Sequence, residues 1–410
     1  MEADERVGDA DAWDAAIVGA GPAGSICALQ LALCGHRVLL VERHRFPRDK
    51  ACGDLLIPGS LEALRRAGLY ERVRRSGRAL EAAAVSSPSR IEWPIRGEFV
   101  VIKRLDLDAM IARGAAEAGA VVARGTVEGI EADAEGPAGE RGDVRLRLKG
   151  GAVARARIAV LATGADVRLL EGLGMIERKA PTAVALRAYL KAPVGPDRLL
   201  ISFDRSIVPG YGWIFPLPGD EYNVGIGTLY EEEPGERPSL KALLDRFLAS
   251  YPPARAMMEA GGSVSAVRGA RLRCGLEGSR LTVTNGRGAG GRVLAIGEAI
   301  GTTYPFTGEG MGKAMESGEL AAEAIHRALT EDRPDWLDEY PRRLREELAP
   351  RYRGYRVAQD WFSRPLLNDL LAWRARRSPF LQRKASQMVA EASDPREAFS
   401  LRGLLRSLWS

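Results

Sequence analysis

A glycine-rich turn near the start of the chain constrains its fold more than any other feature. A short apolar run leads into Gly19-x-Gly21-x-x-Gly24, and an apolar helical stretch follows it. Gly35 is a typical helix stop, and residues 37–41 have the composition of a second buried strand. This order of elements predicts a complete βαβ unit.

The predicted unit has the features of a dinucleotide-binding site. Glycines let the backbone turn tightly and approach a pyrophosphate, whose charge is stabilised at the helix N-terminus. Glu42 ends the second strand, 18 residues beyond Gly24, where its carboxylate can accept hydrogen bonds from the adenosine ribose. The glycine spacing recurs at 286–291, but there it separates two strand-like runs, and we predict a hairpin.

Composition excludes several other classes of protein. The 410 residues suggest two or three domains, and 28% charged residues exclude a fibrous or disordered chain. The four cysteines contain no Cys-x-x-Cys pair and the three histidines lack metal-ligand spacing, so we predict neither a disulfide framework nor a metal site. Basic and acidic residues are mixed, which argues against nucleic-acid binding.

No feature of a secretory signal or a membrane span is expected in this chain. The N-terminal segment is acidic, and no apolar run reaches about 18 residues. We therefore predict a cytoplasmic protein, with a peripheral membrane contact as a further expectation from the C-terminal region.

Later segments repeat the alternation of helix and strand. We expect a helix at about 106–118 and strands at 120–123 and 156–161, the last one followed by Ala162-Thr-Gly164. A further strand at 292–297 precedes Gly308-Glu-Gly310-Met-Gly312, which opens a helix. Between these pieces, residues 181–280 alternate between apolar and polar side chains, as an antiparallel sheet requires.

In this order the motifs resemble the FAD enzymes with the glutathione-reductase type of flavin fold, in their para-hydroxybenzoate-hydroxylase branch, over about residues 12–330. The resemblance implies an α/β protein. Its parts would be a discontinuous Rossmann-like FAD-binding domain, an antiparallel β substrate domain and a helical C-terminal region. We place the FAD-binding domain at 12–80, 101–172 and 281–335. We place the substrate domain at 81–100 and 173–280, and the helical region at 336–410.

The resemblance also implies which residues contact FAD. Arg104, in a Lys-Arg-Leu-Asp-Leu-Asp stretch, would contact the phosphates, and Glu298 would hold the ribityl chain in place of the usual aspartate. The helix that begins near Met311 would direct its N-terminus at the pyrimidine end of the flavin. The predicted cofactor-binding residues are Gly19, Gly21, Pro22, Ala23, Gly24, Glu42, Arg43, Arg104, Gly164, Gly297, Glu298, Gly308, Gly310 and Met311.

Two further motifs are similar to those of the geranylgeranyl reductase family. One is Phe46-Pro-Arg-Asp-Lys-Ala-Cys-Gly-Asp54, and the other is Pro209-Gly-Tyr-Gly-Trp-Ile-Phe-Pro216. The resemblance implies that reduced FAD saturates isolated double bonds of a polyprenyl chain or a similar hydrophobic substrate. NAD(P)H would then dock transiently as the reductant, since no second dinucleotide unit is visible; ferredoxin or another donor is an alternative.

Cys52 is the predicted catalytic residue. Reduction of an alkene needs a hydride on one carbon and a proton on its neighbour, and a thiol near the flavin can supply the proton. The alternative role is that of a small buried hydrophobe, which we expect for Cys27, Cys34 and Cys274.

Tyr211, Trp213 and Phe215 alternate along a predicted strand and so point to one face. They suit either ordinary core packing or the floor of an apolar substrate tunnel, and we favour the tunnel. Tyr304 and Phe306, which flank a proline beside the flavin loop, are weaker candidates for the same role.

The C-terminal region is the most basic part of the chain. Residues 341–384 contain twelve Lys or Arg against four Asp or Glu, and leucines at 400–409 follow a helical spacing. That stripe predicts either a helix docked on its own domain or a basic amphipathic helix on anionic lipid. We expect Lys50, Lys103 and Lys313 to be solvated surface residues.

Three other functions fit the same fold. An aromatic monooxygenase would consume oxygen. A flavin-dependent halogenase would have Trp-x-Trp-x-Ile-Pro, where this chain has Tyr211-Gly-Trp-Ile-Phe-Pro216. A flavin-bearing lipid-binding protein would bind prenyl lipid without turnover.

Overall fold

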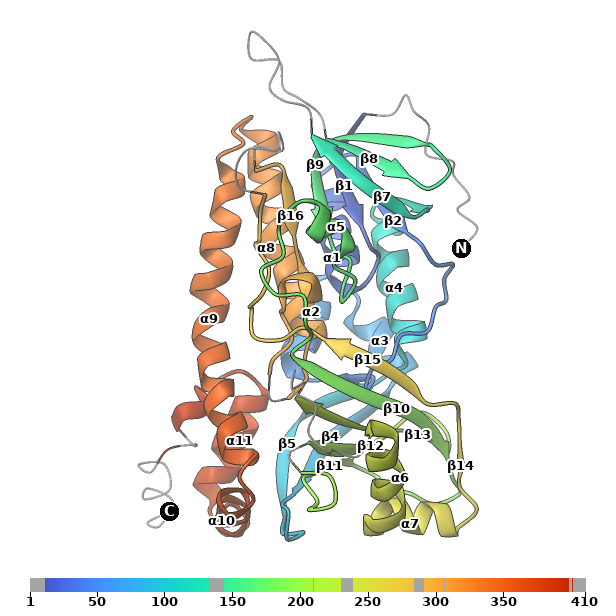
Figure 1. The fold of residues 1–410 in the computed structure, drawn as a ribbon, viewed down its shortest axis with the longest axis vertical. Helices are drawn as coiled ribbons and strands as arrows, with labels where there is room; N and C mark the ends of the chain where they lie inside the picture. Colours follow the sequence, from blue (N-terminus) through green and yellow to red (C-terminus); the bar gives the residue numbers. More distant parts are fainter. Residues whose placement is uncertain are drawn as a thin grey trace.

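Two β-sheets and a column of helices form the molecule. The computed structural model describes residues 12–132, 144–208, 210–229, 239–283, 291–305, 307–397 and 400. In Figure 1 the first sheet lies above the second, and long helices run along one side of both.

The first sheet has the strand order β6-β2-β1-β9-β8-β7, with β16 also paired to β9. Pairs among β6, β2, β1, β9 and β16 are parallel, and those of β7 and β8 are antiparallel. The strands are β1 (Ala12–Val18), β2 (Val38–Glu42), β6 (Val121–Arg124), β7 (Val127–Ala132), β8 (Val144–Leu148), β9 (Val153–Leu161) and β16 (Val293–Ala295).

Helices cover this sheet, which explains why β2 is buried along its whole length. α1 (Pro22–Leu33) follows the glycine turn and packs against both α4 (Arg104–Glu117) and α8 (Met311–Thr330). The predicted βαβ unit is therefore confirmed, and the helix expected at about 106–118 begins at Arg104.

The second sheet has the order β14-β10-β13-β12-β11-β4-β5-β3, with β15 paired to β10. It is antiparallel apart from the β4–β11 pair, so the antiparallel prediction for 181–280 is confirmed. Its strands are β3 (Leu55–Leu56), β4 (Arg78–Ser86), β5 (Glu92–Val101), β10 (Ala183–Lys191), β11 (Leu199–Ser202), β12 (Tyr211–Pro216), β13 (Glu221–Leu229), β14 (Ser263–Val264) and β15 (Arg268–Leu272).

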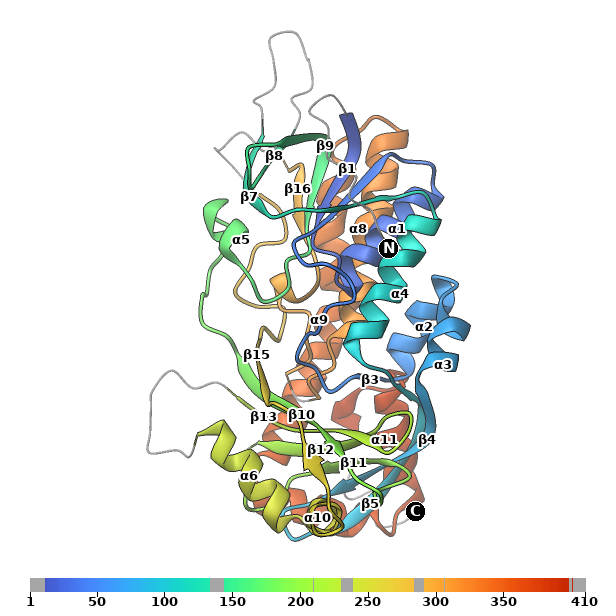
Figure 2. The same ribbon diagram turned by 90° about the vertical axis from the view of Figure 1, so that its right-hand side faces the viewer.

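The remaining helices border both sheets. α9 contacts α8 and extends to the second sheet, where α10 and α11 contact β5 (Figures 1 and 2). The bounds are α2 (Pro58–Arg66), α3 (Tyr70–Ser76), α5 (Arg168–Gly172), α6 (Leu240–Ser250), α7 (Pro252–Glu259), α9 (Trp336–Phe362), α10 (Pro365–Ala375), α11 (Pro379–Val389) and the 3-10 helices η1 (Gly297–Ile300) and η2 (Pro395–Glu397).

Some predictions fall outside the described residues. They concern residues 286–290 of the hairpin turn predicted at 286–291, nearly all of the leucine stripe at 400–409, and Phe306. Thr282 and Leu294, on either side of the glycine repeat, form an isolated antiparallel bridge. Among the described helices, none combines the length and apolar character needed to span a bilayer.

Candidate active site

One cavity of about 750 Å³ connects the two sheets. Its lining includes the glycine loop after β1, the loop around Cys52 after β2, the aromatic side of β12 and the start of α8. β1, β2, β9 and β16 are parallel, so the loops that follow them meet at one edge of the sheet, where open α/β folds bind ligands.

The three glycines of the first motif have different tasks. Gly19 has φ +106°, and a Cβ there would lie 2.4 Å from the Ala162 carbonyl oxygen. A Cβ on Gly24 would lie 2.0 Å from the Gly19 oxygen, so this glycine lets α1 pack against the loop. A Cβ on Gly21 would meet no atom closer than an Arg48 nitrogen at 3.9 Å. The Gly21 backbone is therefore accessible to a pyrophosphate.

Two arginines lie beside this loop. Arg104 is buried, and its guanidinium forms a two-pronged pair with Asp108, at 2.6 and 2.7 Å. Arg48 also approaches Asp108, at 2.9 Å from the Oδ2 atom that Arg104 contacts, and lies 3.4 Å from Glu42 Oε2. Both line the cavity and bring positive charge to the glycine loop.

Sequence reasoning assigned no role to Arg48, although it stands in the quoted motif before Cys52. Its position follows from the path of the chain, which returns from β2 across the glycine loop. The side chain is only 14% exposed, and Nη2 donates a hydrogen bond to the Ala20 carbonyl.

Glu42 is buried at the end of β2. Its Oε2 accepts a hydrogen bond from the Ala20 amide at 3.1 Å, and its Oε1 accepts one from the His44 amide at 3.0 Å. The carboxylate thus holds the loop and also lines the cavity. Arg43 lines the cavity with a more exposed side chain, paired with Asp166 at 2.7 Å.

The other predicted cofactor residues, apart from Gly24, also line the cavity: Gly19, Gly21, Pro22, Ala23, Gly164, Gly297, Glu298, Gly308, Gly310 and Met311. Lys50 pairs with Glu298 Oε2 at 2.9 Å, whereas the buried Oε1 of Glu298 has no hydrogen-bond partner among the described residues. The Oε1 of Glu298, unpaired in the described part of the chain, fits a hydroxyl group of FAD. The open backbone at Gly21 and the guanidinium groups of Arg48 and Arg104 fit its phosphates.

Cys52 also lines this cavity and is partly buried. The adjacent Gly53 lies close under the aromatic strand, because a Cβ there would be 3.3 Å from the Phe215 ring. Burial raises the pKa of the Cys52 thiol, although the nearby Arg104 charge favours the thiolate. The thiol is therefore protonated at neutral pH, the form that can donate a proton.

A buried polar network holds the Cys52 loop. The side-chain amide of Asn223 donates to the Cys52 carbonyl and to Asp54 Oδ2, both at 2.8 Å, and its oxygen accepts from the Trp213 indole at 2.8 Å. Tyr189 donates to the same Asp54 oxygen at 2.9 Å. Burial raises the pKa of Asp54 to about 6, although these hydrogen bonds favour its ionised form.

This network was missed from the sequence. Asp54 ends the quoted motif and Asn223 lies in a predicted strand, but nothing in their spacing indicates that they meet. The pairing of β12 with β13 brings Asn223 opposite Phe215 and next to Trp213.

The three aromatic residues of β12 line the cavity together. Trp213 and Phe215 stack with their ring centroids 6.1 Å apart, and Tyr211 follows at 5.9 Å from Trp213. The prediction for Tyr304 is wrong: it is fully buried and does not line the cavity, because its ring stacks on Tyr355 at 4.0 Å.

One of the three lysine predictions is wrong. Lys313 is buried, with its side chain 3% exposed, because Glu316 and Glu391 pair with it. Lys50 and Lys103 are both partly exposed; Lys50 also lines the cavity and pairs with Glu298, and Lys103 pairs with Glu221 at 2.6 Å. Among the cysteines expected to be buried, Cys27 and Cys274 are buried, but Cys34 is exposed because it caps the end of α1.

Comparison with known protein families gives two adjoining matches. Residues 12–184 match the FAD binding domain, and residues 182–265 match the geranylgeranyl reductase catalytic domain. The menaquinone reductase of Mycobacterium tuberculosis is 34% identical over 366 residues, which cover 85% of this chain and 83% of the relative. A digeranylgeranylglycerophospholipid reductase of Methanopyrus kandleri is 28% identical, with 82% and 86% covered.

Solved structures show the same fold at lower identity. A geranylgeranyl bacteriochlorophyll reductase-like protein from Thermoplasma acidophilum has a TM-score of 0.77 at 20% identity, covering 97% of this chain and 96% of that one. A flavin-dependent brominase has a TM-score of 0.74, also at 20% identity, covering 97% and 98%. Fold likeness by itself therefore does not separate reductase from halogenase.

Proposed function

Because this chain belongs to the geranylgeranyl reductase family of FAD-dependent oxidoreductases, it reduces polyprenyl chains, and we propose that its substrate is the isoprenoid tail of a quinone. The observation that best supports prenyl reduction is that the cavity that begins at the glycine loop continues to the aromatic side of β12. The choice of a quinone is supported by the 34% identity to a menaquinone reductase, against 28% for the phospholipid reductase.

Under this proposal the two ends of the cavity have separate tasks. The glycine loop, Arg48 and Arg104 bind the phosphates of FAD, and Glu298 binds its hydroxyl groups. When bound, FAD supplies the hydride. Apolar side chains from the second sheet hold the prenyl chain and exclude water, and they include Ile95, Phe99, Ile201, Trp213 and Phe215.

Cys52 donates the proton in this proposal. Its loop lies between the two ends of the cavity, and its thiol is neutral. Asn223 and Asp54 act as positioning residues, since they hold the backbone of that loop against the aromatic strand. NAD(P)H or another electron donor supplies the reducing equivalents.

The experiment uses purified holoprotein reduced with dithionite, which removes the need for the natural donor. Menaquinone and a geranylgeranylated glycerophospholipid are supplied separately without oxygen, and the products are analysed by mass spectrometry. We expect menaquinone to gain two hydrogens per reduced double bond, with the added mass in the tail fragment. Gain on the phospholipid alone would contradict the quinone assignment. No gain on either lipid, with substrate-stimulated oxygen uptake on an aromatic compound, would favour a monooxygenase instead.

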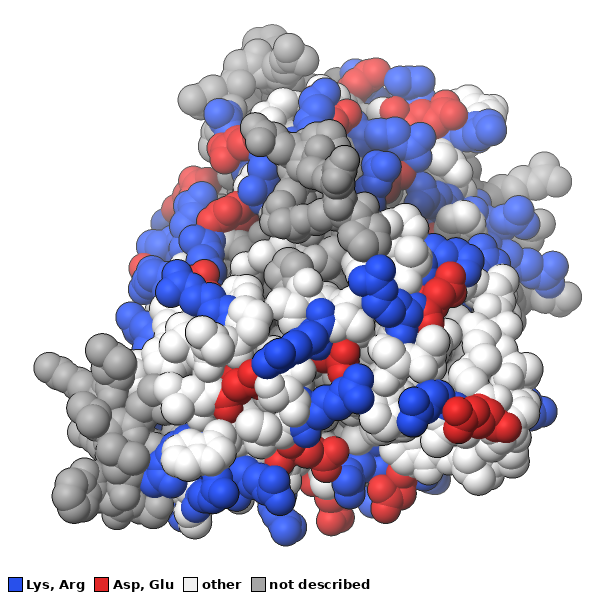
Figure 3. All heavy atoms as spheres, turned by 60° about the horizontal axis from the view of Figure 1, so that its bottom comes forward, with Lys and Arg blue, Asp and Glu red and all other residues white. Residues whose placement is uncertain are grey.

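We further propose that α10 places the protein on an anionic membrane. Leu366, Leu370 and Trp373 are 81%, 45% and 47% exposed and recur at helical spacing on one face. Residues 364–384 contain six Lys or Arg and one acid, Asp369, which faces the sheet and accepts hydrogen bonds from Ser87 and Ser89. Figure 3, which brings the bottom of the molecule forward, shows basic side chains there together with some acidic ones and stretches of uncharged surface.

The position of α10 suits a lipid substrate. α11, the next helix, ends with Met388 and Val389, and both line the cavity. An isoprenoid tail that leaves the membrane at α10 would therefore enter the cavity beside α11. An apolar helix face with basic residues around it is typical of peripheral binding to anionic lipid.

Changing both Leu366 and Trp373 to serine is expected to lower binding to phosphatidylglycerol vesicles at least about tenfold, because each side chain adds about 1.5–3 kcal/mol when buried in lipid. Co-sedimentation measures the binding. Met258→Ser, at another exposed apolar residue (36%), is the matched control and should leave it unchanged. Equal binding by the double variant would remove α10 from the membrane contact.

A further inference from the structure

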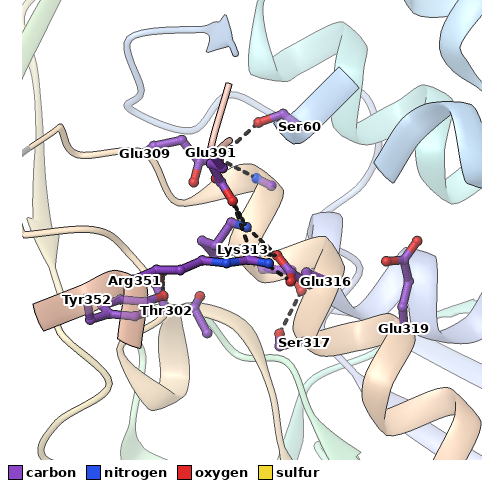
Figure 4. A network of polar contacts seen from close by, with 12 residues as sticks. Ser60, Thr302, Glu309, Lys313, Glu316, Ser317, Glu319, Arg351, Tyr352 and Glu391 are labelled. Atoms are coloured by element: carbon purple, nitrogen blue, oxygen red, sulfur yellow. Dashed lines mark hydrogen bonds and ion pairs between the residues drawn. The ribbon is translucent and has the colours of Figure 1, made fainter. Parts of the chain in front are cut away.

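A cluster of charged residues, largely buried except for the partly exposed Arg351, surrounds the start of α8 (Figure 4). Lys313 pairs with Glu316 and, at 2.6 Å, with Glu391 from the segment after α11. Arg351 of α9 reaches the same two carboxylates, at 3.0 Å from Glu316 and 3.1 Å from Glu391. Glu309 lies beside this cluster, in the loop between Gly308 and Gly310.

Glu309, unlike the residues of this cluster, lines the cavity. It is 8% exposed, and its Oε1 accepts hydrogen bonds from the Gly312 amide at 2.6 Å and the Ser60 hydroxyl at 2.9 Å. Its buried Oε2 has no hydrogen-bond partner among the described residues. One carboxyl oxygen is therefore anchored, and the other is free to carry a proton.

The charges around Glu309 do not balance when every group is ionised. Three carboxylates, on Glu309, Glu316 and Glu391, face the two cations Lys313 and Arg351, which leaves one negative charge in a buried region. Glu316 and Glu391 each contact both cations, whereas no ion pair between Glu309 and a cation occurs among the described residues. Protonation of Glu309 makes the cluster neutral.

The Gly308–Gly310 loop is also where the family resemblance places the flavin, and FAD that has accepted two electrons and one proton carries a negative charge on its pyrimidine ring. Two negative charges in a region of low dielectric constant repel each other strongly. Either the flavin is reduced against that repulsion, or a nearby carboxylate takes up a proton at the same time.

We propose that Glu309 is a redox-linked proton acceptor, which takes up one proton when bound FAD is reduced and releases it when FAD is reoxidised. The balance is then two electrons and two protons for each reduction. The external donor supplies the electrons, one proton goes to the flavin, and the second converts the Glu309 carboxylate into the carboxylic acid. This inference rests on FAD binding in the cavity and not on which lipid is reduced.

Electrostatics around the residue support this role. Burial holds the pKa of Glu309 well above the usual range of a glutamate, and the Glu391 charge raises it further, against the opposing effect of Lys313. Burial lowers the pKa of Lys313, but the charges of Glu391 and Glu316 outweigh it, so the lysine stays protonated. The titratable or charged groups around Glu309 are Lys313 and Glu316 on α8, Arg351, Tyr352 and Tyr355 on α9, Glu391, and Tyr304 in the same loop.

The midpoint potential of the bound flavin, measured with redox dyes across the neutral pH range, tests the proposal. For a two-electron couple each proton taken up lowers the potential by about 30 mV per pH unit. We expect about twice that slope in the unaltered protein at pH values above the raised pKa of Glu309, where the oxidised protein holds it as a carboxylate, and a slope halved to the one-proton value in Glu309→Gln. Glutamine keeps the acceptor for Gly312 and Ser60 but cannot be ionised.

Glu319→Gln is the matched control. Glu319 lies on α8 but pairs with Arg66 at 2.7 Å, outside the cluster, and its variant should keep the slope of the unaltered protein. Equal slopes in the unaltered protein and Glu309→Gln would overturn the proposal. A reduced-minus-oxidised infrared spectrum of the unaltered protein gives a second test, in which a carboxylic acid band must appear on reduction. A yellow protein that meets both criteria but reduces no prenyl lipid would contradict only the proposed function.

Discussion

Replacing Cys52 with alanine is expected to lower the rate of prenyl reduction by about 10²- to 10⁴-fold, the usual contribution of a positioned proton donor. The thiol is protonated because burial raises its pKa, and it faces the cavity between the glycine loop and the aromatic strand. FAD should remain bound, since the loop is also held through the Cys52 carbonyl, which accepts a hydrogen bond from Asn223. Stopped-flow oxidation of the dithionite-reduced flavin by the prenyl substrate, without oxygen, measures the rate.

Cys274→Ala supplies the control for that measurement. Cys274 is also buried but does not line the cavity, so its loss should leave the rate unchanged. A Cys52→Ala protein that oxidises as fast as the unaltered one would exclude the thiol as proton source and leave water or another group in the cavity. The reductase assignment itself would stand.

Replacing Gly24 with alanine is expected to give a protein that purifies without FAD and is less stable by about 3 kcal/mol or more. The new methyl group would lie 2.0 Å from the Gly19 carbonyl oxygen and 2.9 Å from the Ala162 Cβ. The first of these atoms belongs to the backbone of the phosphate-binding turn, so relief of the clash must move the turn itself. The ratio of flavin to protein absorbance measures FAD content, and urea unfolding measures the free energy of unfolding.

Gly172→Ala tests whether any glycine replacement would have this effect. No heavy atom lies within 4 Å of a Cβ at Gly172, and its φ is outside the range that disfavours a side chain. This variant should keep both its flavin and its stability. A Gly24→Ala protein with full FAD content and the stability of the unaltered chain would show that the loop tolerates the displacement, and that our account of this glycine is wrong.

The βαβ unit could be predicted because its signals are local. Gly19, Gly21 and Gly24 occupy adjacent turns of the chain, and apolar residues mark β1, α1 and β2 on either side. The residues that specify the strand, the turn and the helix follow one another in the sequence, so no distant contact is needed to recognise the βαβ unit. The same holds for the alternating aromatics of β12.

The residues that were missed or misplaced have partners far away in the sequence. Asn223 contacts the Cys52 loop from 171 positions away, and Lys313 is neutralised by Glu391, 78 positions further on. Tyr304 stacks on Tyr355 of α9 and does not line the cavity. The local sequence does not show whether a lysine or tyrosine side chain faces water, a lipid tail or a buried partner.

By itself, the sequence determined the glycine turn, its acid at Glu42, the order of the elements and the cysteine motif, because backbone conformation and apolar periodicity act over a few residues. Only the tertiary structure decided that two arginines share Asp108, that Asn223 supports Cys52, and that Glu309 adjoins a cluster of paired charges. The reason is physical: the cost of a buried charge depends on which groups lie within a few ångströms of it, and here those groups come from separate helices and loops.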